Sequence, residues 1–183
     1  NRLPLAIEAV KRLVRRLRPD DRVAIVTYAE ETRVALPPTE AANAAAIRRC
    51  LAALEPVGLT NGAEGLRLAY ATVRQGWIEN GLNAVVLCTD GNFNLGATDE
   101  AVLAGVATDE ARRGARLSVF GFGRTDRNDL RLEILARSGG GRSCYVNTRA
   151  EAERLLGQEI DGLLAPVAAD LRARIEFDSA RVE

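Results

Sequence analysis

One apolar run constrains the fold of this 183-residue chain more than any other stretch. Residues 84–88 read Ala-Val-Val-Leu-Cys, which is typical of a central parallel strand buried on both faces. Thr89, Asp90 and Gly91 follow it directly. Because ligands of open α/β sheets bind beyond the carboxyl ends of the strands, Asp90 is expected at the ligand-binding edge. By itself, an aspartate before a glycine fits a cap or turn equally well.

Strand-like and helix-like stretches alternate along most of the chain. Strands are expected at residues 22–28, 84–88, 116–122 and 143–146. Residues 32–36 alternate like a short edge strand that forms a hairpin with residues 22–28. This order predicts an α/β fold: a doubly wound, mostly parallel, Rossmann-like sheet with helices on both faces and one antiparallel edge strand.

Capping signals set the expected ends of the helices. Pro37 and Pro38 are expected to end the edge strand, and Thr39 then caps a helix that ends near Leu54. Gly114 is placed to end a later helix. The other helices are expected over residues 3–17, 63–77, 98–113 and 129–137.

The last part of the chain differs from the rest. Thr148 and Glu151 have the spacing of a capping box, which predicts a helix that runs to Ile160 or Leu164. After Asp170, apolar and charged residues alternate as in a two-faced strand. We therefore divide the chain into an α/β domain, residues 1–165, and an exit strand toward a further domain, residues 166–183. Because the chain has no Met, it is expected to be a fragment or a processed product.

The composition excludes several classes of function. The chain has no histidine, which removes Ser-His-Asp triads, imidazole bases and His-ligated zinc. Lys+Arg and Asp+Glu both total 25, so no net charge points to nucleic acid or to an anionic membrane. Cys50, Cys88 and Cys144 are far apart, and no disulfide between Cys50 and Cys88 is expected. No apolar stretch approaches the length of a membrane span.

A hydroxyl and a carboxylate lie in loops that follow the same edge of the predicted sheet. These are Thr60, which precedes the helix at Ala63, and Asp90. Oxygen ligands without histidine or thiolate suit Mg²⁺, Mn²⁺ or Ca²⁺ rather than zinc. The alternative is that Thr60 caps the helix and Asp90 caps a turn, which the spacing alone slightly favours.

The remaining motifs fit ordinary turns and caps. Gly121-x-Gly123 follows a strand, but Asp126 stands where a dinucleotide loop needs its third glycine and would repel a pyrophosphate. The glycines at 139–141 could hold an anion, although a plain turn is sufficient. Asp126 and Asp129 could act as an acid-base pair, but helix capping explains Asp129 equally well. Nothing assembles a nucleophile, a base and an oxyanion hole.

Three stretches together resemble a bacterial von Willebrand factor type A domain. They are Arg22–Tyr28, Leu59–Gly62 and Val86–Asn94. Gly121-Phe-Gly123, with Asn128-Asp129 after it, is similar to a subgroup of bacterial envelope proteins. The resemblance covers roughly residues 1–164. It implies a doubly wound sheet with a metal-ion-dependent adhesion site (MIDAS) at its top, and a location in the bacterial cell envelope or outside the cell.

The resemblance also implies a set of ligand residues. In the family, ligands come from an Asp-x-Ser-x-Ser after the first strand, a threonine in a second loop and an aspartate in a third. Thr60 and Asp90 match the last two, and the ligand-binding loops then contain Asn61, Gly62, Gly91 and Asn92. Asn92 stands where the subgroup often has an aspartate. The ion, Mg²⁺ or else Mn²⁺ or Ca²⁺, recruits an acidic group from a partner protein.

One part of the family site is absent from these 183 residues. They contain no Asp-x-Ser-x-Ser, and residues 3–17 resemble the helix that should follow it. We therefore expect an open space beside Ala84–Cys88 and weak or absent metal binding by these residues alone.

The resulting hypothesis is a non-catalytic module that binds a protein through a metal site. One alternative is a structural or assembly module of a larger envelope protein with a vestigial metal site. The other is a flavodoxin-like or nucleotide-binding enzyme, which would need phosphate-binding glycines that the sequence does not show.

Overall fold

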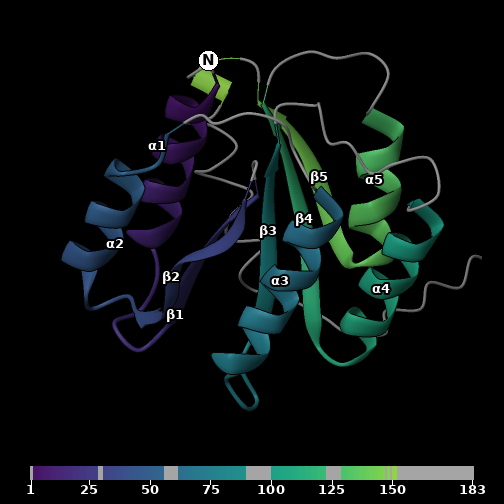
Figure 1. Ribbon diagram of the computed structural model, residues 1–183, viewed down its shortest axis with the longest axis horizontal. Coiled ribbons are helices and arrows are strands. Elements are labelled where there is room, and N and C mark those ends of the chain that lie inside the picture. The colour runs from purple at the N-terminus through teal and green to yellow at the C-terminus, as the bar shows by residue number, and fades with distance from the viewer. Residues whose placement is uncertain are drawn as a thin grey trace, which may run out of the picture.

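The computed structural model has an α/β fold with helices on both sides of a layer of strands (Figure 1). It describes residues 2–28, 31–55, 62–89, 100–122, 129–146, 148 and 150–151. The strands are β1 (Arg22–Tyr28), β2 (Thr32–Glu40), β3 (Asn83–Thr89), β4 (Ala115–Phe122) and β5 (Gly140–Val146). The helices are α1 (Leu3–Val14), α2 (Ala44–Ala52), α3 (Gly62–Gln75), α4 (Glu100–Arg112) and α5 (Asp129–Ser138). The predicted fold class is confirmed.

The strands form two hydrogen-bonded sheets. β3, β4 and β5 are parallel and adjacent in that order. β1 and β2 form the predicted antiparallel hairpin, with a register that runs from the Arg22–Glu40 pair to the Tyr28–Thr32 pair. No backbone pairing joins β1 to β3 within the described residues. β3, β4 and β5 are therefore parallel and the hairpin is antiparallel, as predicted. The expectation that residues 22–28 form a further parallel strand is wrong within the described residues, because β1 pairs only with β2, and β3 ends one sheet instead of lying at the centre of a continuous one.

The side chains of β3 are less buried than those of the adjacent strand β4. β4 is buried at every residue except the half-buried Arg116. On β3, the side chains at Val85 and Leu87 are buried, whereas Ala84 is exposed and Val86 and Cys88 are only half-buried. The prediction of burial on both faces is thus wrong at Ala84 and only partly met at Val86 and Cys88, which pack against the cluster formed by α1, β4 and β5.

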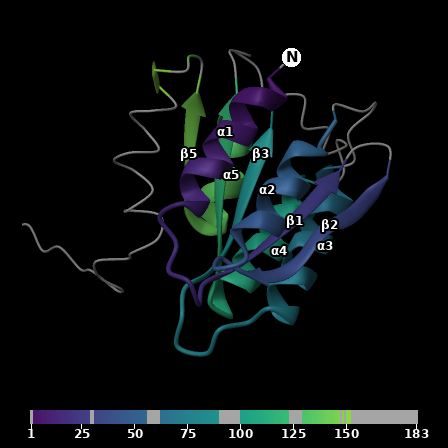
Figure 2. The same cartoon turned by 90° about the vertical axis from the view of Figure 1, so that its left-hand side faces the viewer.

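Helix α1 packs with two stripes of its surface. The predicted stripe, which includes Ile7, Val10 and Val14, contacts a cluster around Ile47 and Leu51 of α2. A second stripe that the sequence analysis missed packs against β4 and β5 and consists of Leu5, Ala6, Ala9 and Leu13. Because α1 touches both sheets, it covers the junction between them (Figure 2).

The second strand is longer than predicted. β2 continues through Pro37 and Pro38 to Glu40. Prolines are tolerated on an edge strand and at a β-bulge, and the register of β1 and β2 shifts between Val23 and Ile25, opposite the two prolines. Helix α2 is capped by Asn43, whose side chain accepts a hydrogen bond from the Ala46 N–H at 3.3 Å. Thr39, the predicted cap, instead donates its hydroxyl to the Pro37 carbonyl.

The glycines at 139–141 allow a close approach and do not form an anion cradle. A Cβ at Gly141 would lie 2.0 Å from the Leu117 carbonyl oxygen, and one at Gly139 would lie 2.4 Å from the Leu117 Cβ. Gly140 and Gly141 belong to β5 rather than to a turn. Only glycine lets the end of α5 and the start of β5 pack so tightly against β4.

The capping box at the end of the described chain is confirmed. The Thr148 N–H donates to the Glu151 carboxylate at 3.2 Å, and the Glu151 N–H donates to the Thr148 hydroxyl at 3.1 Å. The helix predicted to follow, and the segment 166–183, lie outside the described residues. In the part of the chain that is described, no helix is long and apolar enough to cross a membrane.

Candidate metal site

Most of the predicted site residues lie outside the described residues. These are Thr60, Asn61, Asp90, Gly91 and Asn92. Their attachment points are described: Gly62 is the buried first residue of α3, and Thr89 is the last residue of β3, 6% exposed.

These two attachment points belong to elements that meet at Tyr28, the last residue of β1. The Tyr28 hydroxyl donates a hydrogen bond to the Cys88 carbonyl oxygen near the end of β3. On the other side, α3 contacts the tyrosine at Gly65, where a Cβ would lie 2.4 Å from the Tyr28 Cβ. The ends of β1 and β3 and the start of α3 therefore converge at one side chain. The sequence analysis missed Tyr28; its only signal was an aromatic residue at the end of a strand.

The Tyr28 hydrogen bond also shows that β1 and β3 are not paired as neighbouring strands at this point. Paired strands lie about 4.8 Å apart and bond backbone to backbone. Here a whole tyrosine side chain is needed to reach from β1 to the β3 backbone. Because backbone groups alternate in direction along a strand, those of Ala84 and Val86 face the same side as the Cys88 carbonyl. Within the described residues, this edge of β3 therefore has no strand partner, and the open space expected beside Ala84–Cys88 remains a prediction.

The described side chains do not by themselves form a metal centre. Among them, no group of three or more Cys, Asp or Glu residues is close enough to hold an ion. Burial raises the pKa of the Cys88 thiol from 9.0 to about 12, so this thiol stays protonated at neutral pH and is a poor ligand. The remaining donors near this edge would be oxygens, as the composition predicts.

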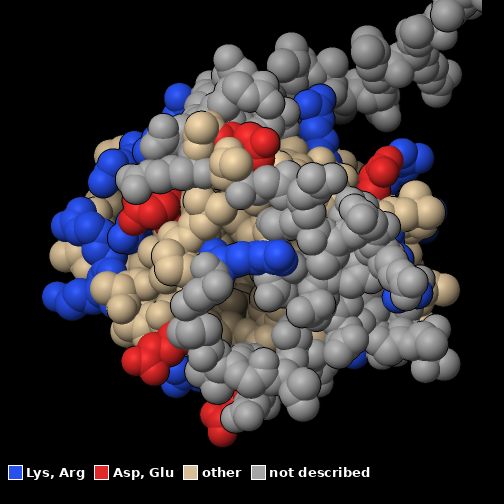
Figure 3. Space-filling model, turned by 90° about the horizontal axis from the view of Figure 1, so that it is seen from above, with Lys and Arg blue, Asp and Glu red and all other residues tan. Residues whose placement is uncertain are grey.

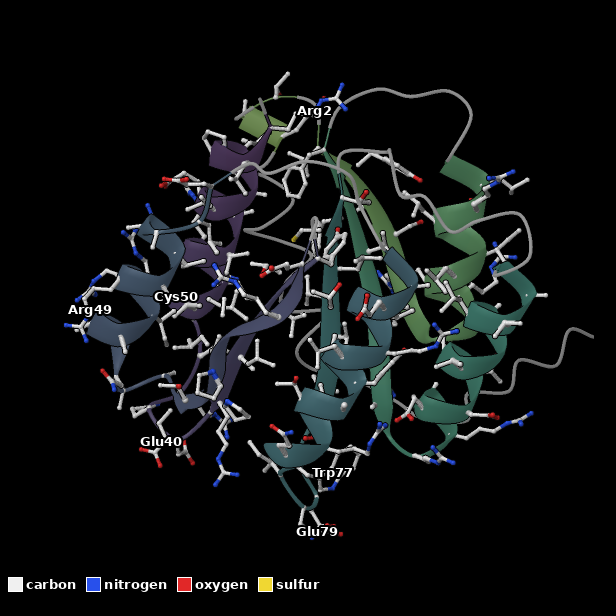
Figure 4. The ribbon with its side chains drawn as sticks, in the orientation of Figure 1. Arg2, Glu40, Arg49, Cys50, Trp77 and Glu79 are labelled. Carbon is white, nitrogen blue, oxygen red and sulfur yellow. The ribbon has the colours of Figure 1, made fainter. Side chains whose placement is uncertain are left out.

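The one buried carboxylate of the described residues has a different role. Glu110 of α4 is 6% exposed and accepts hydrogen bonds from Arg74 of α3 at 2.5 Å and from Arg113 at 3.1 Å. The adjacent Tyr70 is 1% exposed, and burial followed by the charge of Glu110 raises its pKa. The Arg74–Glu110 pair joins the carboxyl-terminal parts of α3 and α4. After α3 the chain continues to Trp77 and Glu79, which lie at the bottom of Figure 4.

Comparisons with known proteins agree with this architecture. A family model described as the von Willebrand factor type A domain matches residues 1–92. YfbK of Escherichia coli (strain K12) is 39% identical over 181 residues, a match that covers 99% of this chain and 32% of YfbK. The chain thus spans about a third of the length of that relative.

Solved structures share the same fold. BatB from Bacteroides thetaiotaomicron matches with a TM-score of 0.70 and 22% identity, over 88% of each chain. Proximal thread matrix protein 1 from the mussel byssus, solved with a zinc-occupied MIDAS motif, matches with a TM-score of 0.69 and 19% identity, over 87% of this chain and 42% of that one.

Proposed function

Because the chain belongs to the von Willebrand factor type A domain family, we propose that it binds a partner protein through a divalent metal ion at the carboxyl ends of β1 and β3. In this proposal Thr60 and Asp90 are two of the ligands, and Asn61, Gly62, Gly91 and Asn92 form the loops around the ion. The module acts by binding and not by catalysis, in the bacterial cell envelope or outside the cell.

The convergence at Tyr28 is the observation that carries the proposal. Thr60 precedes α3 by two residues, and Asp90 follows β3 directly. Because α3 packs on Tyr28 at Gly65 and β3 is bonded to Tyr28 at Cys88, both loops start from fixed points next to the same side chain. A rigid base of this kind is what positions loop ligands within a metal site.

Two oxygen ligands are too few for tight binding, because Mg²⁺ gives up its hydration shell reluctantly. We propose that the other ligands come from a strand that precedes these residues in the complete protein, carries Asp-x-Ser-x-Ser at its end and lies between β1 and β3. The edge of β3 that has no strand partner among the described residues supports this placement. Such a strand would have to be apolar on both faces, since core clusters lie on either side of the space.

The chemistry of the ligands explains the choice of partner. An ion held by neutral hydroxyls and few carboxylates keeps a strong attraction for one more anionic oxygen. A carboxylate on a partner protein supplies that oxygen. The zinc-occupied motif of the mussel thread protein supports metal binding within this fold, although that protein shares only 19% identity with this chain.

Calorimetric titration of the complete protein with Mn²⁺ tests the site. We expect millimolar or tighter binding, weakened at least about tenfold by Asp90→Ala and by Thr60→Ala. Asp109→Ala is the matched control, because Asp109 is an exposed carboxylate on α4. Unchanged binding in Asp90→Ala would refute the ligand assignment, and no binding by the unmodified protein would favour the structural-module alternative.

A further inference from the structure

Positive charge is concentrated on one outer face, although the chain as a whole is neutral. Between residues 2 and 18, the only acid is Glu8. The cations of the same stretch are Arg2, Lys11, Arg12, Arg15, Arg16 and Arg18. Helix α2 adds Arg48 and Arg49 and contains no acid. Although the net charge is zero, positive charge is therefore concentrated in residues 2–18 and in α2.

These cations lie on two neighbouring helices or in the residues at the ends of α1. α1 and α2 pack together through Ile7, Val10 and Val14 on one side and Ile47 and Leu51 on the other. In Figure 2 the two helices run side by side on the face turned toward the viewer. We call the outward side of this pair the basic face and define it by Lys11, Arg15, Arg48 and Arg49.

Helical periodicity places the members of the basic face outward. Lys11 and Arg15 each follow a residue that faces α2, so they lie at the border between the helices. Arg15, Arg48 and Arg49 are exposed, and Arg49 points away from the protein while Cys50 lies on the inner side of α2 (Figure 4). Seen from above, blue side chains gather along the side formed by α1 and α2 (Figure 3).

Acidic side chains neutralise little of this face. Glu8 pairs with Lys11 at 2.8 Å, and both groups are partly exposed. In the segment that follows α1, Asp21 accepts a hydrogen bond from the backbone N–H of Arg18, which leaves the charge of the Arg18 guanidinium unchanged. Glu40 lies beyond the start of α2, at the bottom of the view in Figure 4.

We propose that the basic face docks on an anionic phospholipid surface. Guanidinium groups on long side chains bind phosphate oxygens in pairs, and a lipid surface offers phosphates in a broad layer that needs no pocket. Clusters of several Lys and Arg residues on one helical surface are attracted to such layers within a screening length. The apolar stripes of α1 are already packed on the sheets, so the contact would be electrostatic and peripheral.

The same face is poorly suited to other anionic partners. Protein interfaces have an apolar centre, and the exposed large apolar side chains of the described residues, Val102, Leu130 and Ile134, are all on α4 and α5. Single-stranded nucleic acid is held by aromatic stacking, and neither α1 nor α2 contains an aromatic residue. A lipid surface requires neither feature.

Co-sedimentation of the complete protein with lipid vesicles tests the proposal. One set of vesicles is phosphatidylcholine alone, and the other contains about 30% phosphatidylglycerol. We expect binding only to the second set, with release in about 0.5 M NaCl. The triple variant Arg15→Gln, Arg48→Gln, Arg49→Gln should bind at least about tenfold more weakly.

A matched control removes the same charge elsewhere. Arg112→Gln, Arg137→Gln, Arg142→Gln also neutralises three exposed arginines, on α4, α5 and β5, and should bind within about twofold of the unmodified protein. Equal binding to both vesicle types, or equal losses in the two triple variants, would overturn the proposal. The proposal would also be overturned if the protein bound duplex DNA or polyglutamate but bound the two kinds of vesicle equally. Circular dichroism of each variant verifies folding.

Discussion

The hydroxyl of Tyr28 donates a hydrogen bond to the backbone carbonyl of Cys88 and so joins the two sheets. A side chain thus makes a bond that a neighbouring strand would make in a continuous sheet. The contact holds the ends of β1 and β3 together next to the start of α3. The geometry of the proposed metal loops therefore depends on a residue that is not itself a ligand.

Removing this hydroxyl should lower stability. Tyr28→Phe leaves the part-buried Cys88 carbonyl without its donor, and we expect a loss of about 1 kcal/mol in the free energy of unfolding. Urea denaturation followed by circular dichroism measures it. An unchanged midpoint would mean that the hydrogen bond contributes nothing to the folded state.

Two helical glycines should respond in opposite directions to alanine. Gly65→Ala places a Cβ 2.4 Å from the Tyr28 Cβ, and the resulting strain is expected to cost about 1–3 kcal/mol. Gly105→Ala in α4 meets no atom within 4 Å and should instead stabilise the protein by up to about 1 kcal/mol through helix propensity. Thermal unfolding of both variants measures the difference. Equal shifts would contradict the close contact at Tyr28.

The buried carboxylate on α4 should matter more than its exposed neighbour. Glu110→Gln weakens hydrogen bonds to Arg74 and Arg113, and because both arginines are at least half exposed the expected loss is about 1–2 kcal/mol. Asp109→Asn is the control: its pair with Arg112 is exposed and 3.5 Å long, so its effect should stay within about 0.5 kcal/mol. Similar losses in the free energy of unfolding for the two variants would argue against a role of Glu110 in joining α3 and α4.

The thiols give a prediction that depends on pH. Cys50, Cys88 and Cys144 are free, as predicted for all three. With its pKa raised to about 12, Cys88 should resist a thiol reagent near pH 8 in the folded protein and react once urea is added. Above pH 9 the unfolded chain releases a proton that the folded chain retains, so stability should fall as the pH rises. A flat profile, or rapid labelling of folded Cys88, would contradict this.

The alternation of strands and helices was sufficient to predict the fold. Apolar periodicity located α3 and its buried Leu66 and Tyr70, and the spacing of Thr148 and Glu151 predicted a real capping box. Local signals failed at Pro37 and Pro38, where the edge position of β2 decides what proline can do. The second stripe of α1 was missed because its alanines are weakly apolar, and only the packed sheets show that Ala9 is buried.

The candidate site was less predictable than the fold. Thr60 and Asp90 were identified from residue type, loop position and family resemblance, and they remain predictions because they lie outside the described residues. The open space beside β3, expected from the missing Asp-x-Ser-x-Ser, also remains a prediction. The role of Tyr28 was not predicted, because its hydrogen bond to Cys88 joins residues that are 60 positions apart in the chain.

Comparing Mn²⁺ binding by two lengths of the chain tests the central claim most directly. One sample is the 183-residue chain, and the other carries, before Asn1, the proposed strand that ends in Asp-x-Ser-x-Ser. We predict no tight binding by the shorter chain, and millimolar or tighter binding by the longer one that Asp90→Ala weakens. Tight binding by the shorter chain, or a longer chain indifferent to Asp90→Ala, would contradict the account.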